Sequence, residues 1–321
     1  MSELLVKIDN DFVWDGIQRP FFENYFLKIC DPFSCWSLCL YFFIDCPSDG
    51  VHPGISRVLA SYVTTQGEKI LVQNDYDLHL YDIVHTDPFL KIHENILTLA
   101  DCMGCVEHEK NRIKWDFRFE DPVLSSRPIS KTLQKFSKIK FFLPRLLSFV
   151  SGDFYVNHKK HSLNRVRVTQ GHMVGPRIPS PFSLAHCVDF PDDPLAYFEA
   201  LCWPTPLKEA HFFCVGMEGQ AFRADSLSQV FWRNRSVRKS DHWQLQFFSR
   251  GFRFDCQVTQ EPQLKFHFPF LGGVKPLQCQ STMMADIEIQ VLKRHRGRWQ
   301  EYKQLKSSKK CTWEEVSPLQ A

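Results

Sequence analysis

The sequence predicts an all-β protein: an antiparallel barrel or sandwich in two halves. Strand-like runs recur along the chain with turn residues between them. Aromatic residues are abundant, with 29 Phe, 8 Trp and 8 Tyr among 321 residues, and such residues favour sheets. A chain of this length accommodates two β domains of moderate size, and 44% hydrophobic against 23% charged residues excludes a disordered chain.

The strands of the first half are predicted from apolar runs and from alternation. The expected strands are Ser34–Ile44, Val58–Thr65, Lys69–Gln73 and Arg112–Glu120. The last of these alternates with period two, which is typical of a half-buried strand. Its apolar phase consists of Ile113, Trp115, Phe117 and Phe119.

The second half contains more such runs, separated by Asp-Pro, Gly or Ser. Many evenly spaced strands with this punctuation favour a barrel or sandwich. The expected strands are Ala185–Phe190, Phe198–Cys202, His211–Met217, Gln220–Ala224, Trp243–Phe248, Phe252–Val258, Leu264–Phe268, Ala285–Leu292 and Trp299–Gln304.

One segment, residues 133–150, predicts a short amphipathic helix. Apolar side chains recur there at helical spacing, lysines and Arg145 fall on the opposite face, and Pro144 would kink it. Such a helix could lie on an anionic membrane surface. Alternatively, it could pack across a barrel mouth or between the lobes.

Charge is strongly segregated along the chain. Residues 1–126 carry 10 Lys/Arg against 20 Asp/Glu, residues 127–165 carry 9 against one, and residues 293–310 carry 8 against one. The two basic segments could contact an anionic membrane, above all through residues 127–165, or could be ordinary solvated faces. No helix-turn-helix, zinc-finger or RNP pattern accompanies them, so nucleic acid is not an expected partner.

Several classes of protein are not expected. No apolar run approaches the roughly 18 residues of a membrane span, and the first residues lack an export signal, so a cytoplasmic protein with reduced cysteines is expected, peripheral to a membrane at most. The Cys102–Cys105 spacing has no second such pair, so no metal site is expected. Nucleotide-binding and hydrolase motifs are missing, and no cofactor is predicted.

The segment Gln170–Phe190 is the most unusual part of the sequence. Its glycines and prolines impose an extended path, and His172 and His186 lie near its two ends. His186, Val188 and Phe190 are expected on one face of a strand. A histidine among aromatic residues is either a hydrogen-bonded core group or a proton donor inside an apolar cavity.

The stretch Arg19–Lys28 resembles the "YFEGWYFK" signature of the lipocalin-like family that includes tocopherol cyclase, carotenoid hydratase (CrtC) and AttH-type proteins. The spacing to the run ending at Ile44 is similar, as are the order of Gly171–Gly175 and Ala185–Phe190 and the late strand Cys279–Ile289. There are departures from the family pattern. Asn24 and Tyr25 replace Gly and Trp, His172–Gly175 has lost an acid and an indole, and Phe182 and Leu184 stand where Trp is common.

The resemblance implies two lipocalin-like β-barrel lobes, residues 19–165 and 166–305, each able to enclose an apolar ligand. The family's enzymes protonate an isoprenoid C=C bond, and water or an internal phenol oxygen captures the carbocation. That chemistry needs a protonated acid in an apolar wall and aromatic rings nearby. The resemblance therefore implies proton donors from Glu23, His172 and His186, and ligand contacts from Tyr25, Trp36, Arg177, Phe190 and Glu199.

Three functions remain open from the sequence. The first is binding of a lipid or isoprenoid without turnover, which the lost acid and indole favour. The second is an isoprenoid-modifying cyclase or hydratase, which the retained Glu23 and the histidines favour. The third is a structural or membrane-surface protein whose barrels are filled by their own side chains.

Overall fold

The computed structural model describes residues 13, 17–31, 35–47, 54–78, 81–82, 90–129, 139–205, 208–270 and 277–319. Nearly all of this is antiparallel β-structure, which confirms the predicted all-β fold with lipocalin-like lobes. The chain divides into two compact units: of the described residues, those up to 127 and 139–178 form the first, and 128–129 and those from 179 onward form the second. The expected boundary at residues 165 and 166 falls inside one long strand of the first unit.

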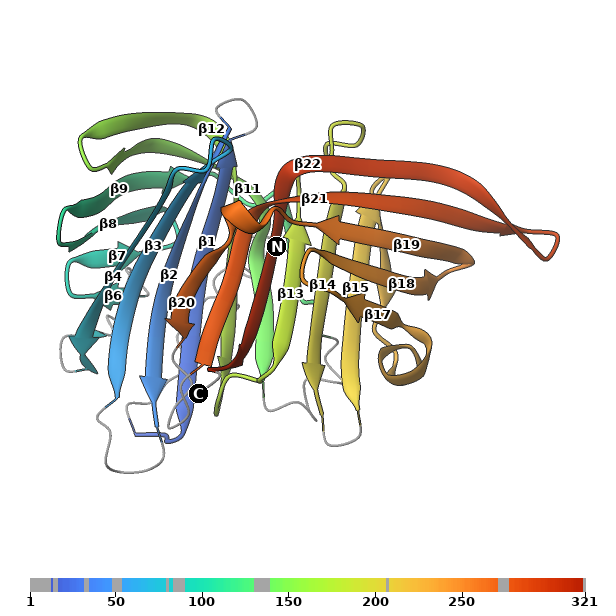
Figure 1. Cartoon of the computed structure of the whole chain (residues 1–321), viewed down its shortest axis with the longest axis horizontal. Coiled ribbons are helices and arrows are strands. Elements are labelled where there is room, and N and C mark those ends of the chain that lie inside the picture. Colours follow the sequence, from blue (N-terminus) through green and yellow to red (C-terminus); the bar gives the residue numbers. More distant parts are fainter. Residues whose placement is uncertain are drawn as a thin grey trace. The chain divides into compact units, whose positions relative to one another are not determined.

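The first unit is one sheet of twelve strands, shown in blue to green in Figure 1. Its hydrogen-bonded order is β4-β3-β2-β1-β12-β11-β9-β8-β7-β6-β5, and β10 pairs with β11. The strands are β1 (Phe21–Asp31), β2 (Trp36–Cys46), β3 (Ile55–Thr64), β4 (Lys69–Asp77), β5 (Tyr81–Asp82), β6 (Leu90–Ile92), β7 (Asn95–Leu97), β8 (Asp101–His108), β9 (Asn111–Phe119), β10 (Leu124–Ser126), β11 (Lys140–Val156) and β12 (Lys159–Gly175).

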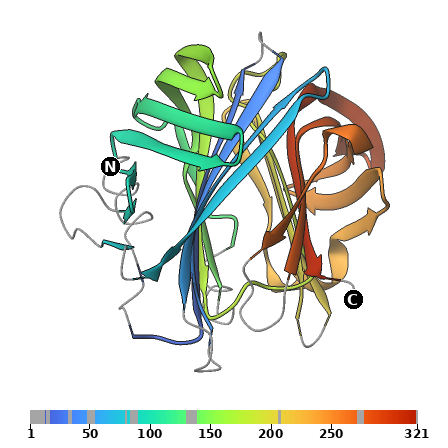
Figure 2. The same ribbon diagram turned by 60° about the vertical axis from the view of Figure 1, so that its left-hand side comes forward.

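The second unit is a sheet of ten strands in the order β16-β15-β14-β13-β22-β21-β19-β18-β17, with β20 paired to β21. Figure 2 shows the sheet of each unit curling around its own interior. The strands are β13 (Phe182–Cys187), β14 (Tyr197–Pro204), β15 (Glu209–Met217), β16 (Gln220–Ala224), β17 (Arg235–Arg238), β18 (His242–Ser249), β19 (Phe252–Thr259), β20 (Phe266–Phe270), β21 (Leu277–His295) and β22 (Arg298–Pro318), with short helical turns η2 (Gln229–Arg233) and η3 (Pro262–Leu264).

The two sheets share one connectivity. In each, the first four strands form a meander, and the last strand of the unit returns to pair with the first: β12 with β1, and β22 with β13. A three- or five-residue strand, β10 or β20, pairs with the long strand before the last. The chain therefore repeats this arrangement, with the five strands β5–β9 in the first unit where the second has the three strands β17–β19.

Side-chain amides tie neighbouring strands together where the sheets curl round. In the first unit, Asn74 on β4 accepts a hydrogen bond from the backbone N–H of Glu107 on β8 (3.1 Å) and donates one to its carbonyl (3.3 Å). In the second unit, the Asn234 amide donates to the carbonyls of His211 and Ala224. These contacts satisfy backbone groups that an open sheet edge would leave unpaired.

Each unit has its own apolar core. On β9 the predicted apolar phase is buried, from Ile113 to Phe119, and the alternate residues are exposed. This confirms the period-two prediction for that strand. In the second unit, Trp243, Phe254 and Trp313 are among the core side chains.

The amphipathic helix predicted over 133–150 is wrong for the part the structure describes. Lys140–Val156 is strand β11, and residues 133–138 lie outside the described residues. Lys140–Val150 is buried along nearly its whole length, and a continuous apolar run fits a buried strand as well as a helix. Pro144, which cannot donate to the ladder, lies where the pairing with β12 shifts register between Phe142 and Arg145.

The cations of segment 127–165 do not form a helical basic face between residues 140 and 165. Arg145 is buried, Lys160 pairs with Asp153, and Arg165 pairs with Glu120. Binding of a membrane through this segment stays a prediction. No helix in the described part of the chain has the length and hydrophobicity needed to cross a bilayer.

Candidate functional site

Glu23 points into the interior of the first unit. On β1, the odd-numbered neighbours Phe21, Tyr25 and Leu27 belong to the apolar core, so Glu23 shares their face. Its side chain is fully buried. A carboxyl group in such a setting needs hydrogen bonds to offset its desolvation.

Those hydrogen bonds all converge on one oxygen. Glu23 Oε1 lies 2.7 Å from Nε2 of His172, accepts from the Tyr25 hydroxyl at 3.0 Å and accepts from the backbone N–H of Val13 at 3.2 Å. Oε2 has no hydrogen-bond partner among the described residues. Since Oε1 already accepts three hydrogens when His172 donates, a proton held by Glu23 would sit on Oε2.

Strand pairing brings His172 to this carboxyl. β12 returns antiparallel to β1 in a register that places His172 directly opposite Tyr25. The two rings stack with centroids 4.1 Å apart and an interplanar angle of 8°, and Phe142 lies 5.9 Å away on the other side. The imidazole is therefore fixed between aromatic rings, with Nε2 aimed at Glu23.

Gly171 accommodates the ring of its cross-strand partner, Phe26. A Cβ at Gly171 would lie 2.0 Å from the Phe26 ring, so any larger residue would have to displace that ring. The glycine predicted to impose an extended path thus leaves room for an aromatic side chain next to His172.

Two further polar side chains line the same interior from the long hairpin. Gln170 precedes His172 by two residues, and Arg145 Nη1 donates to its Oε1 at 3.4 Å. Arg145 also donates to the carbonyl of Leu99 and lies over the Phe119 ring. Burial lowers the pKa of this arginine to about 10. Sequence reasoning missed both residues. Arg145 was missed because the predicted helix assigned it to an exposed face.

The geometry gives this cluster a clear chemical capacity. A carboxyl oxygen and an imidazole nitrogen lie within hydrogen-bond distance at 2.7 Å, in apolar surroundings with Tyr25 and Phe142 beside them. Such a pair can donate a proton and take one back, and ring faces nearby favour a developing cation. Of the predicted site residues, the structure brings together Glu23, Tyr25 and His172.

Trp36 lies at the far end of the same interior. Ile44 is the cross-strand neighbour of Glu23, and Trp36 is eight residues away along β2, about 26 Å. Trp36 packs there against Phe154, Tyr62 and the ring of His161. Burial is the largest cause of the lowered pKa of His161 and raises the pKa of Tyr62 to about 12.

His186 and Glu199 belong to the second unit and are opposite each other on β13 and β14. The register extends this pair into a row across five strands, with Thr312 on one side and Cys214 and Arg223 on the other. The row faces away from the core, because Ala185 and Cys187 are the core residues of β13. His186 and Glu199 are nevertheless buried.

The charges of this row influence one another. Burial, with a smaller contribution from Glu199, raises the pKa of Cys214 to about 12. Burial alone would lower the pKa of Arg223, but Cys214 and Glu199 raise it overall. The Cys214 thiol therefore stays protonated at neutral pH, which argues against a nucleophilic role.

The remaining predicted residues lie elsewhere. Phe190 is in the core of the second unit, and Arg177 is exposed between β12 and β13. The prediction that His186, Val188 and Phe190 share a face is wrong. The strand ends at Cys187. Beyond this point the chain changes direction, so Phe190 lies in the core whereas His186 faces the opposite side of the sheet.

Sequence reasoning also missed an ionic cluster inside the second unit. Arg238 donates to Ser183 Oγ at 3.0 Å and pairs with Glu209, and the other Glu209 oxygen lies 3.4 Å from Nε2 of His211. Nδ1 of His211 lies 3.5 Å from the Cys202 sulfur. Burial raises the pKa of this fully buried thiol far above its usual range, so the Cys-His-Glu arrangement is not a nucleophilic triad.

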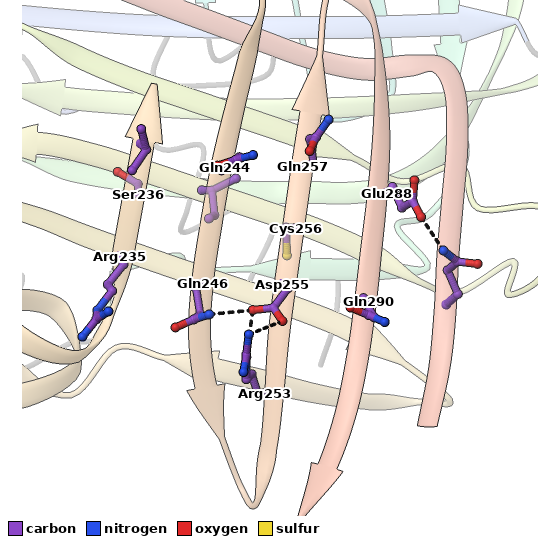
Figure 3. Close-up of a pocket in the computed structure, with 13 residues that line it drawn as sticks. Arg235, Ser236, Gln244, Gln246, Arg253, Asp255, Cys256, Gln257, Glu288 and Gln290 are labelled. Carbon is purple, nitrogen blue, oxygen red and sulfur yellow. Dashed lines mark hydrogen bonds and ion pairs between the residues drawn. The ribbon is translucent and has the colours of Figure 1, made fainter. Parts of the chain in front are cut away.

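A groove of about 580 Å³ runs over the outer face of the second sheet (Figure 3). Most of the side chains that line it are polar, although Val237, Leu245 and Cys256 also line it, and it shares no residue with the predicted site. Arg253 and Gln246 bind Asp255 there, as Figure 3 shows. The sequence feature that could have indicated this face is the alternation of glutamines with apolar residues along Trp243–Phe248, because the glutamines of such a strand point away from the core.

Comparison with known proteins yields structural similarity alone. No protein-family model matches the chain, and no curated protein matches it. The solved structure of CghA matches with a TM-score of 0.60 at 8% identity, covering 94% of this chain and 88% of CghA. CghA with Sch210972 gives 0.59 at 9% identity, covering 94% and 89%, and kievitone hydratase from Nectria haematococca gives 0.55 at 10% identity, covering 98% and 94%.

At these identities the similarity shows a shared fold. The chain has the lipocalin-like fold of CghA and kievitone hydratase over nearly its whole length. The narrower resemblance to tocopherol cyclase, carotenoid hydratase and AttH-type proteins stays a prediction.

Proposed function

We propose that the first unit binds a hydrophobic small molecule with a carbon–carbon double bond and adds a proton to that bond. The observation that carries the proposal is the buried Glu23–His172 contact of 2.7 Å in an aromatic, apolar interior. Proteins of the same fold include a kievitone hydratase, which is consistent with such chemistry.

The reaction balances without a cofactor. The π electrons of the double bond take the proton from Glu23 Oε2, forming a C–H bond and leaving a carbocation and a carboxylate. Water, or a hydroxyl group of the same substrate, attacks the cation and forms a C–O bond. Its surplus proton returns to Oε2 of the carboxylate, while His172 keeps its contact with Oε1, and this restores the starting state.

The ligand must reach a site whose members are almost completely covered. Glu23, Tyr25 and His172 are 0%, 0% and 1% exposed. Val13, whose backbone N–H binds Glu23, has a side chain that is 41% exposed. The carboxyl therefore lies one hydrogen bond away from an exposed residue, and the substrate enters by displacing the Val13 contact.

A direct test uses a prenylated phenol as the probe, incubated with the protein in heavy water. The expected product carries deuterium at the protonated carbon and either a new hydroxyl group or a new ether ring, detected by mass spectrometry. Glu23→Gln should lower the rate by roughly 10²–10⁴-fold, the usual contribution of a general acid. The matched control is Glu315→Gln in the second unit, which should leave the rate unchanged.

Two results would contradict the proposal. An unchanged rate in the Glu23→Gln protein would remove the pair from the chemistry. A probe recovered bound but unmodified, with native mass spectrometry showing the complex, would replace catalysis by simple ligand binding.

A further inference from the structure

The hairpin formed by β21 and β22 ends in a dense group of exposed cations. Lys293 and Arg294 lie near the end of β21, Arg296 lies in the turn and Arg298 begins β22, while Arg250 lies on the adjacent β18–β19 turn. We call these five residues the basic hairpin tip. Each of them is exposed.

The tip projects past the neighbouring strand. Pairing between β19 and β21 ends with Phe252 opposite Lys293, and the Arg294 N–H then donates to the Gly251 carbonyl at 3.0 Å. Among the described strands, the one that pairs with the residues after Arg294 is their own hairpin partner, β22. Figure 1 shows this hairpin extending beyond the β18–β19 turn.

Within the part of the chain that the structure describes, the charge of the tip is not neutralised by ion pairs. Across the described residues, none of its five cations forms an ion pair, although Lys293 lies over the rings of Phe252 and Tyr302. This distinguishes the tip from the other basic segment, in which Lys160 and Arg165 are paired with acids. Such a concentration of positive charge attracts an extended anionic surface.

Aromatic side chains accompany the cations. Trp299 is directly opposite Arg294 on the hairpin and is 37% exposed, and Tyr302 on the other face is 43% exposed. Trp and Tyr are enriched where a protein meets the boundary between water and lipid. Basic residues flanked by aromatic rings therefore fit a bilayer surface better than they fit a nucleic acid, for which the tip offers no base-reading element.

We infer that the basic hairpin tip docks the protein on membranes that carry anionic lipids. Each cation near such a surface strengthens binding by about fivefold at moderate salt. The attraction is electrostatic, so it weakens as the screening length falls from about 10 Å at 0.1 M salt to about 3 Å at 1 M.

The test is flotation of the full chain with vesicles of phosphatidylcholine, with or without about a third phosphatidylserine. The wild-type protein should float with the anionic vesicles, stay in solution with the neutral ones, and be released by high salt. The variant Arg294→Gln/Arg296→Gln/Arg298→Gln should lose roughly 100-fold in partition coefficient. The matched control, Lys110→Gln/Lys114→Gln/Lys239→Gln, removes three exposed cations elsewhere and should retain at least most of the wild-type binding.

A folded-state check by circular dichroism accompanies each variant, and Trp299→Ala tests the aromatic contribution with the charges intact. Binding to both vesicle types alike, no binding to either, or an equal loss from both triple variants would overturn the inference. So would stronger binding to duplex DNA or RNA than to anionic vesicles at the same salt.

Discussion

The two units use the same strand order but place buried charge in different settings. In the first, Glu23 lies on the interior face of β1 and meets a histidine at 2.7 Å, with both side chains almost fully buried. In the second, Ser183 begins the interior of β13 and meets Arg238, which is itself paired with Glu209. Those two ionic side chains are 26% and 29% exposed.

This difference separates a chemical role from a structural one. An acid neutralised by arginine near solvent keeps its charge and holds strands together. An acid held in an aromatic interior by a histidine, a tyrosine hydroxyl and a backbone N–H can exchange a proton with its neighbour and with a ligand. Topology is therefore shared between the units, while of these two ion pairs it is the Glu23–His172 pair that has the setting for proton transfer.

The largest expected difference between the two units is in the free energy of unfolding of variants that break or replace the buried pair. Glu23→Ala leaves His172 and Tyr25 without a buried partner and should cost about 3–5 kcal/mol of unfolding free energy. Glu23→Leu/His172→Phe should recover most of that loss, since an apolar pair needs no hydrogen bonds. Denaturant titration measures both.

Glu209→Gln is the counterpart in the second unit. Because Glu209 and Arg238 are partly exposed, the substitution should cost less than about 1 kcal/mol. Equal losses for Glu23→Ala and Glu209→Gln would show that the two settings do not differ as described.

The side-chain amides that join strands across each curled sheet also differ in how deeply they are buried. Asn234 is 5% exposed and binds two carbonyls, whereas Asn74 bonds at an exposed position. Asn234→Ala should cost about 2 kcal/mol, and Asn74→Ala about 1 kcal/mol. Thermal unfolding of the two variants checks the order, and a larger loss at Asn74 would reverse it.

The smallest effects concern pH. Each unit contains a histidine whose pKa is lowered chiefly by burial: His161 in the first and His211 in the second. The unfolded chain takes up these protons first as pH falls below about 6.5, so the folded state loses stability from there downward until the folded histidines also protonate. Each contributes at most about 1.4 kcal/mol per pH unit.

Histidine variants can show which unit causes the loss of stability at low pH. His161→Phe and His211→Gln should each flatten the fall of melting temperature between about pH 7 and pH 5. Glu209 opposes the shift of His211, so Glu209→Gln should make that fall steeper. A variant pair with wild-type slopes would show that these histidines keep their ordinary pKa in the folded protein.

The sequence was informative where one physical rule decides the outcome. Period-two alternation on Arg112–Glu120 suffices for β9, because one face of that strand is buried and the other solvated. The run around Pro144 carries no such signal, since nearly every position of β11 from Phe141 to Val150 is covered. A helix and a strand were therefore equally compatible with this run, and the helix that we predicted is wrong.

The candidate site shows the same limit. Glu23 and His172 could be named separately, the first through a resemblance and the second through its unusual surroundings. Their contact could not be predicted, because it joins residues 149 positions apart and depends on the register of β12 against β1. The cluster of Arg238, Glu209 and His211 gave no local pattern at all.

The returning strands determine when each unit can be completed during synthesis. β1 gains its second neighbour when the ribosome has made residues up to Gly175, and β13 waits for Val316. Until then each first strand exposes one edge of an apolar sheet, and such late, distant pairing slows folding and invites association between nascent chains. Removing β22 would leave the second unit permanently in that incomplete state.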